Sequence, residues 1–174
     1  MKKTVIVYGL LSGAVISIIM GISVAFYSSN ANADHSMAMG YTFMLLAFSL
    51  IFVAIKTYRD KQNGGTITFG KAFKIGLLIS VIASAIYVAT WAVEYKYYFP
   101  DFMDKYSAHM IEKAKASGIA QSAIDKQSAD MAKMKENYKN PIYFTLLTFA
   151  EIFPVGLLVS LIAALVMRRK NKVP

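Results

Sequence analysis

Four apolar stretches, each close to the length of a membrane-spanning helix, constrain this chain more than any other feature of its sequence. They cover residues 5–27, 37–55, 72–93 and 142–167. A helix needs about 20 mainly apolar residues to cross the hydrocarbon core of a bilayer. Hydrophobic residues make up 56% of the chain, whereas roughly half is usual in soluble domains. We therefore expect an all-α, polytopic membrane protein, with residues 1–174 forming one domain built on a four-helix bundle.

The uneven distribution of charge predicts how this bundle is oriented. Eleven basic residues and one acid, Asp60, lie before the first stretch, around the loop between the second and third, and after the fourth. The opposite side of the predicted spans carries eight lysines and eight acids. Basic residues accumulate on the cytoplasmic side of membrane proteins, so we expect both termini in the cytoplasm. This distribution argues against nucleic-acid binding despite the net charge of +9, and it favours contacts with anionic lipids.

The N-terminus permits a second interpretation. Lys2 and Lys3, the first apolar stretch and the sequence Ala31-Asn32-Ala33 together resemble a signal peptide with its cleavage site. The apolar region of a signal peptide covers only about 7–15 residues, and the first stretch here is longer. We therefore expect it to be retained as a transmembrane helix. Cleavage would leave the orientation of the other three spans unchanged.

Small residues recur every four positions within three of the spans. Helices in lipid associate through close backbone approach and polar contacts, which such spacing provides on one helical face. We therefore expect these residues to form the packing seams of the bundle, while a dimer interface on the first span is the alternative. The predicted packing residues are Gly9, Gly13, Ser17, Gly21, Gly76, Ser80, Ser84, Gly156 and Ser160.

Residues 94–141 between the third and fourth spans are too polar to cross a membrane, but they are patterned as helices. Apolar residues recur at helical spacing on both sides of Gly118. Gly118 is a plausible helix C-cap, and Asn140-Pro141 marks the entry to the fourth span. We therefore expect an extracytoplasmic antiparallel helical hairpin. Its apolar stripes either pack on each other or receive a partner.

Glu151 is the most informative single residue because it lies within the fourth span. An ionised carboxylate in hydrocarbon is costly, so we expect Glu151 to face the bundle interior with a partner or to remain protonated. The expected partner is a serine or threonine hydroxyl on a neighbouring span, such as Thr90, or Thr148 on the same helix. Pro154 follows three residues later and frees the carbonyl of Ala150. An acid beside a helix kink is typical of a proton- or cation-coupled site, whereas a hydrogen-bonded structural acid is the alternative.

Other chemical signals in the sequence are weak. His35, Met37 and Met39 place an imidazole and two thioethers together, a ligand set that suits Cu(I). Met37 and Met39 also simply begin the second span, so we predict no metal site here. The chain has no cysteine and two histidines, and no catalytic triad or pair of catalytic carboxylates is present. We therefore expect no cofactor and no enzymatic activity.

Three segments carry a resemblance to a known family. They are Phe69-Gly70-Lys71-Ala72-Phe73-Lys74, the Asn140-Pro141 junction, and the run from Pro154 to Ile162 that precedes a basic tail. Together they resemble the bacterial family of small four-span membrane proteins filed as domain of unknown function four-one-nine-nine. The resemblance implies a bacterial inner-membrane location and supplies no activity or catalytic residues.

Two functions are consistent with these features. The first is a non-enzymatic structural or accessory protein, in which the hairpin meets another copy of the chain or a membrane or periplasmic protein. The alternative is a small oligomeric transporter or channel that uses Glu151 at a Pro154 kink.

Overall fold

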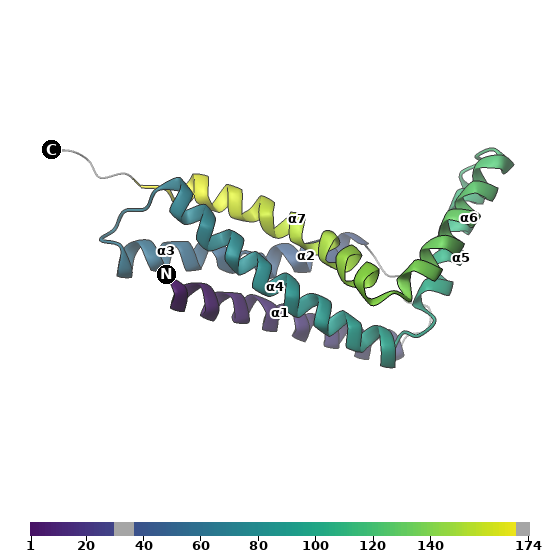
Figure 1. The fold of residues 1–174 in the computed structure, drawn as a ribbon, viewed down its shortest axis with the longest axis horizontal. Coiled ribbons are helices and arrows are strands. Elements are labelled where there is room, and N and C mark those ends of the chain that lie inside the picture. Colours follow the sequence, from purple (N-terminus) through teal and green to yellow (C-terminus); the bar gives the residue numbers. More distant parts are fainter. Residues whose placement is uncertain (30–36, 170–174) are drawn as a thin grey trace. The chain divides into compact units, whose positions relative to one another are not determined.

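The computed structural model describes residues 1–29 and 37–169, and this part of the chain is almost entirely α-helical (Figure 1). The long apolar helices are α1 (Lys2–Ser29), α4 (Phe69–Tyr97), α7 (Pro141–Met167) and the consecutive pair α2 (Met37–Phe48) and α3 (Leu50–Gln62). They provide four candidate membrane spans, with α2 and α3 forming one of them. The predicted all-α class and the four spans are confirmed, so the chain is a multi-pass membrane protein.

A turn at Ser49 divides the second span into α2 and α3. The Ser49 hydroxyl donates a hydrogen bond to the carbonyl of Leu46 at 2.6 Å, and the amide of Phe52 donates to the carbonyl of Ser49 at 3.0 Å. The backbone bond from Phe52 reaches only three residues along the chain. The Ser49 amide is shared between the carbonyls of Leu45 and Leu46 at 2.9 and 3.2 Å, so the helix is interrupted here by a tightened turn. The second span was predicted as one uninterrupted apolar stretch. The turn interrupts it because the Ser49 hydroxyl competes with backbone amides for a carbonyl oxygen of the helix.

Residues 1–90 and 149–169 form one compact unit, the bundle unit, which contains α1, α2, α3 and most of α4 and α7. Its core is built mainly from aliphatic side chains, together with Met44, Phe48 and Tyr58. Ile51, Ile75, Ile79 and Ile152 are fully buried. Large apolar side chains also cover the outside of these helices, including Leu10 and Leu46 at 53% and 59% exposure. Apolar residues on both faces are expected where the outside meets lipid rather than water.

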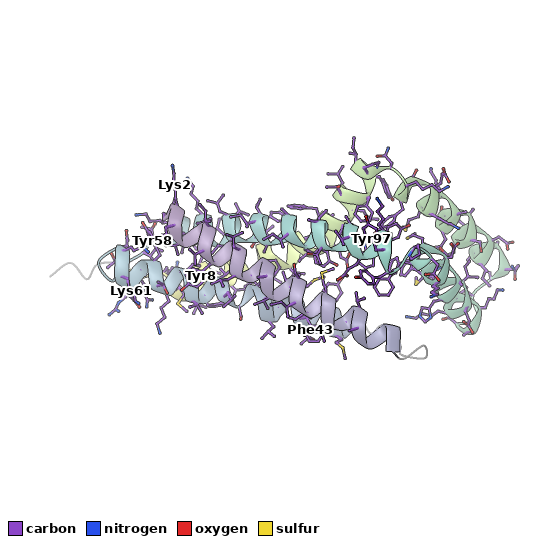
Figure 2. All side chains as sticks on the ribbon, turned by 90° about the horizontal axis from the view of Figure 1, so that it is seen from below. Lys2, Tyr8, Phe43, Tyr58, Lys61 and Tyr97 are labelled. Atoms are coloured by element: carbon purple, nitrogen blue, oxygen red, sulfur yellow. The ribbon has the colours of Figure 1, made fainter. Side chains whose placement is uncertain are left out.

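Basic residues gather at the end of the bundle unit that holds the N-terminus, which we call the basic end. Figure 2 shows Lys2 and Lys61 near Tyr8 and Tyr58 there. The terminal amino group donates to Gln62 Oε1 at 3.3 Å, and Arg59 Nη1 donates to the carbonyl of Met167 at 3.2 Å. An isolated bridge also pairs the backbones of Ile67 and Arg169. These contacts hold the ends of three spans together. The described basic residues of this end are Lys2, Lys3, Lys56, Arg59, Lys61, Lys71, Lys74, Arg168 and Arg169.

The second compact unit covers residues 91–148 and contains a hairpin of α5 (Phe102–Ala116) and α6 (Gln121–Tyr138). The two helices lie side by side and antiparallel (Figure 1). Lys135 forms an ion pair with Asp104, while Gln127 Nε2 donates to the carbonyl of Met110 at 3.5 Å. Residue numbers therefore rise along one helix as they fall along the other. The predicted antiparallel hairpin is present.

Local capping explains where the hairpin turns and where α7 begins. Gly118 follows α5 with a φ of +67°, a left-handed conformation that glycine adopts without strain. Asn140 Oδ1 accepts the backbone amides of Ile142 and Tyr143 at 2.9 and 3.3 Å, which makes Asn140 the N-cap of α7. Pro141 occupies the first helical position, where its missing N–H costs no hydrogen bond.

Candidate functional site

Glu151 lies on the face of α7 that points away from the bundle. Its side chain is exposed, whereas Ile152 and Gly156 beside it on the helix are buried. Five residues separate Glu151 from Gly156, which places them about 140° apart around a helix of 3.6 residues per turn. The expectation that Glu151 faces the bundle interior is therefore wrong. When a helix is apolar on every side, the position of one acid does not reveal which face of the helix packs against the rest of the bundle.

The two hydroxyl groups predicted as partners of Glu151 are placed differently. Thr90 on α4 shares a hydrogen bond with Ser17 on α1, with the two oxygens 2.7 Å apart. The Thr148 hydroxyl is buried and has no hydrogen-bond partner among the residues that the structure describes. Glu151 itself forms no hydrogen bond or ion pair with the described residues. The structure therefore provides no internal partner for this carboxyl group in the described part of the chain.

Pro154 is exposed on the same side of α7, and the helix continues through it from Pro141 to Met167. It lines a shallow apolar groove on the outside of the bundle unit between α4 and α7. The groove is lined by Phe73, Pro154, Leu157, Leu158 and Leu161. Because this lining offers no charged or hydrogen-bonding side chain, the groove suits a hydrocarbon chain or an apolar helix face.

Small residues bring α4 and α7 together in a reciprocal arrangement. A Cβ atom added to Gly76 would lie 2.8 Å from Ser160 Oγ, and one added to Gly156 would lie 2.7 Å from Ser80 Oγ. Gly76 therefore faces Ser160 and Gly156 faces Ser80, which requires the two helices to run antiparallel. Such close approach lets the helix backbones pack without intervening side chains. Ser84, the next residue of the series, is fully buried and its hydroxyl has no described partner.

The small residues of α1 lie against α4. Added Cβ atoms would come within 2.9 Å of Ile82 at Gly9 and 2.3 Å of Ile86 at Gly13. The Ser17–Thr90 hydrogen bond continues this contact one turn further, so α1 and α4 run parallel with a constant register. Gly21 is exposed, and an added Cβ would meet no described atom within 4 Å.

The weak metal candidate falls largely outside the described structure. His35 lies in the part of the chain that is not described, and the side chain of Met37 is not described either. Met39 is on α2 with 52% of its side chain exposed. Among residues 1–29 and 37–169, no group of three histidine, cysteine or acidic side chains is positioned to hold a metal ion.

Glu94 is a buried acid that its sequence context did not reveal, because it falls in the polar segment between the third and fourth spans. It lies near the end of α4 with only 7% of its surface exposed. No ion pair or side-chain hydrogen bond joins it to the described residues. Its helical neighbours Trp91 and Tyr95 pack in an aromatic cluster with Tyr138 and Phe144. The signal in the sequence that points to its burial is the group of aromatic residues on either side of this acid at the end of a span.

The aromatic cluster ties the hairpin to the helices that lead into it. Trp91 Nε1 donates a hydrogen bond to the Tyr138 hydroxyl at 2.8 Å, which joins the end of α4 to the end of α6. Phe102 at the start of α5 packs edge-to-face on Trp91 with ring centroids 5.0 Å apart. Buried Met103, Tyr138 and Phe144 form the centre of this cluster. The base of the hairpin is thus packed rather than loosely linked.

Two features stand out in the described part of the chain. The carboxyl groups of Glu94 and Glu151 form no hydrogen bond or ion pair with the described residues, and Glu151 lies on an exposed, apolar face of α7. The polar hairpin stands on the packed aromatic base formed around Trp91 and Tyr138.

Comparison with known protein families places most of the chain in one family model. A family model described as "Protein of unknown function (DUF4199)" matches residues 7–169, which is nearly the whole chain. No curated protein and no solved structure matches the sequence or the fold.

Proposed function

Because this chain belongs to the DUF4199 family, whose description names no activity, we propose a function from its own surfaces: a non-enzymatic accessory protein that presents the α5–α6 hairpin to a protein partner. The partner is another copy of the chain or a membrane or periplasmic protein. The observation that carries the proposal is the packed base of the hairpin, where Trp91 and Tyr138 are hydrogen-bonded. A fixed base presents a surface with less loss of conformational entropy on binding than a flexible loop would.

The hairpin surface available to such a partner is polar. The apolar residues Ala114 and Ile124 are buried within the hairpin, so they are not free to receive another protein. Charged side chains of both signs cover the outside, and pairs such as Asp101–Lys105 and Glu136–Lys139 lie in solvent. Polar, mixed-charge surfaces are typical of transient interfaces rather than obligate ones.

We further propose that the protein resides in a bacterial inner membrane with both termini in the cytoplasm. The charge distribution supports this orientation, because the nine described basic residues of the basic end accompany one acid, Asp60, which is itself paired with Arg59 at 2.7 Å. The excess of positive charge also favours binding of anionic lipids at this end, by about 1 kcal/mol for each lysine or arginine near the surface.

Site-specific photocrosslinking in intact membranes tests the hairpin proposal. We would place a photoreactive amino acid at His109 on α5 or Ala129 on α6, which are both exposed, and at Leu10 on α1 as the matched control. The proposal predicts a discrete protein adduct from the hairpin positions that the control does not give. If neither hairpin position captures a protein and the purified protein shows no contact between hairpins, the proposal is wrong.

Transport through an oligomer is the second candidate, and the unpaired carboxyl group of Glu151 is the observation that favours it. Because Glu151 points away from its own bundle, a path that includes it requires more than one copy of the chain. Proton or cation flux in reconstituted vesicles, abolished by Glu151→Gln, would support transport. Vesicles that show no flux with the unmodified protein would exclude it.

A further inference from the structure

Glu151 is part of a regular stripe on the outward face of α7, which we call the α7 stripe. Its five residues are spaced alternately three and four positions apart, and all are exposed. Leu158, Leu161 and Leu165 are 55%, 41% and 48% exposed, respectively. The stripe extends over 14 residue steps, or about 21 Å along the helix axis. It consists of Glu151, Pro154, Leu158, Leu161 and Leu165.

This spacing has the geometry of a helix–helix seam. Apolar positions alternating by three and four residues keep one face of a helix against a partner as the two helices wind around each other. Most helix pairs in membranes cross at the shallow left-handed angle that this spacing produces. Leucines on the outside of a membrane protein need only lipid, however, so spacing alone does not require a partner.

The requirement for a partner comes from Glu151. It lies ten residues after Pro141, or about 15 Å along α7 from the start of the helix. A carboxyl group at such a depth is stabilised by a polar partner, because hydrocarbon provides none. No described residue forms a hydrogen bond or ion pair with it, and its neighbours on the α7 stripe are apolar.

We propose that two copies of the chain associate through their α7 stripes, with the two Glu151 carboxyl groups hydrogen-bonded to each other. Copies in one membrane share the same orientation, so a two-fold axis along the membrane normal brings identical residues together at the same depth. A protonated carboxyl group has both a donor and an acceptor, so two of them satisfy each other. Two copies therefore satisfy both carboxyl groups with no further polar side chain at that depth, whereas a different partner helix would have to supply a polar side chain there.

Most of the small residues do not compete for this role, because they are already covered within the bundle, with Gly21 as the exposed exception. Gly9 and Gly13 on α1 are covered by Ile82 and Ile86, which removes these two glycines from a dimer interface on the first span. Gly76 and Gly156 are likewise covered by serines of the facing helix. The α7 stripe is a different surface from the hairpin, so the pairing does not rest on the hairpin proposal, and it requires no transport through the Glu151 site.

Disulfide crosslinking of the full-length protein in lipid vesicles tests the pairing, and the natural chain contributes no cysteine of its own. Leu165→Cys places a thiol on the α7 stripe. Val166→Cys is the matched control, because Val166 is equally deep and 64% exposed but points about 100° away around the helix. We expect Leu158→Cys and Leu165→Cys to form crosslinked dimers on mild oxidation and Val166→Cys to form several-fold fewer.

Changing Glu151 in the Leu158→Cys variant separates the contribution of the carboxyl pair to dimer formation from the contribution of leucine packing. Glu151→Gln keeps a donor and an acceptor and should keep the dimer, whereas Glu151→Leu should lower the association constant about tenfold, within the range known for polar contacts between membrane helices. Equal crosslinking of Leu165→Cys and Val166→Cys would overturn the interface. Unchanged crosslinking in Glu151→Leu would overturn the carboxyl pair. Circular dichroism of each variant confirms that the helices are retained.

Discussion

Ser80 on α4 and Ser160 on α7 meet across the interface between their helices, with their hydroxyl oxygens 3.1 Å apart. Each hydroxyl also lies within hydrogen-bond distance of the carbonyl four residues earlier in its own helix, at Gly76 and Gly156. Each serine stands opposite the glycine of the other helix. Two glycine–serine pairs thus form one antiparallel contact, in which missing side chains permit the approach and hydroxyl groups provide the polar link.

Gly156→Ala should destabilise the bundle, because the added methyl group would lie 2.7 Å from Ser80 Oγ and 2.8 Å from Phe48 Cζ. Overpacking of this kind costs about 1–3 kcal/mol, and the better helix propensity of alanine offsets part of it. We expect a lower thermal unfolding midpoint in detergent. Gly21→Ala is the control, since its methyl group meets no described atom, and it should leave the midpoint unchanged or slightly raised. Equal midpoints for the two variants would contradict the packing.

The hydrogen bond between Ser17 and Thr90 should couple α1 to α4. Such bonds between membrane helices average about 0.6 kcal/mol in double-mutant cycles. We expect a coupling energy of this size between Ser17→Ala and Thr90→Val, measured from unfolding in a denaturing detergent. A cycle of Ser17→Ala with Ser49→Ala provides the comparison, because the Ser49 hydroxyl bonds within its own helix segment. The hydrogen bond makes no contribution if both cycles give zero coupling.

Tyr138→Phe should loosen the base of the hairpin, because the Trp91 indole loses the hydroxyl to which it donates. Leaving a fully buried donor without a partner costs about 1–3 kcal/mol, and we expect the lower end of this range because Trp91 is half-buried. Trp91 is the sole tryptophan of the chain, so its fluorescence reports this site directly. We expect a changed emission maximum together with faster amide hydrogen exchange in α5 and α6. Tyr97→Phe is the control on an exposed ring, and an equal effect there would contradict a specific role for the Tyr138 hydroxyl.

The sequence was sufficient to predict the helices, because the physical constraints on them are local. Apolar length determines the spans, Gly118 permits a left-handed turn, and Asn140-Pro141 caps α7. The break at Ser49 was not predicted, because a serine within a membrane helix accommodates either a continuous backbone or a tightened turn. Which of these forms depends on what packs around it.

The faces of the helices were harder to predict than their bounds. A soluble helix reveals its buried face by the period of its apolar residues, but α7 is apolar on every side. Glu151 was therefore expected to face inward, and it faces outward. Glu94 was assigned to a polar segment, and it is 93% buried, since the aromatic residues around it pack against α6 and the start of α7. Both positions are decided by tertiary contacts that no single stretch of sequence contains.

The hydrogen bond from Lys105 holds the pKa of Asp101 below its usual range, with the two groups 2.8 Å apart one helical turn from each other. The carboxylate therefore stays ionised as the pH falls past the point where an unfolded chain would bind the proton. The stability that this contact contributes is fully present when the pH is above the pKa of Asp101 in the unfolded chain. It is lost as the pH falls through the lower pKa of Asp101 in the folded protein. Lys105→Gln should raise the pKa of Asp101 in a carbon-detected NMR titration. An unchanged titration would contradict the contact.

The central claim is a four-span protein with its hairpin on one side of the membrane and its basic end on the other. Cysteine labelling of intact cells tests it most directly, because the natural chain contains no cysteine and each introduced thiol is therefore the single site of labelling. Ser117→Cys lies at the hairpin turn and Lys61→Cys at the basic end, and both positions are exposed. We predict that a membrane-impermeant maleimide labels Ser117→Cys in intact cells and labels Lys61→Cys only after permeabilisation. Labelling of both positions in intact cells, or of Lys61→Cys alone, would contradict the account.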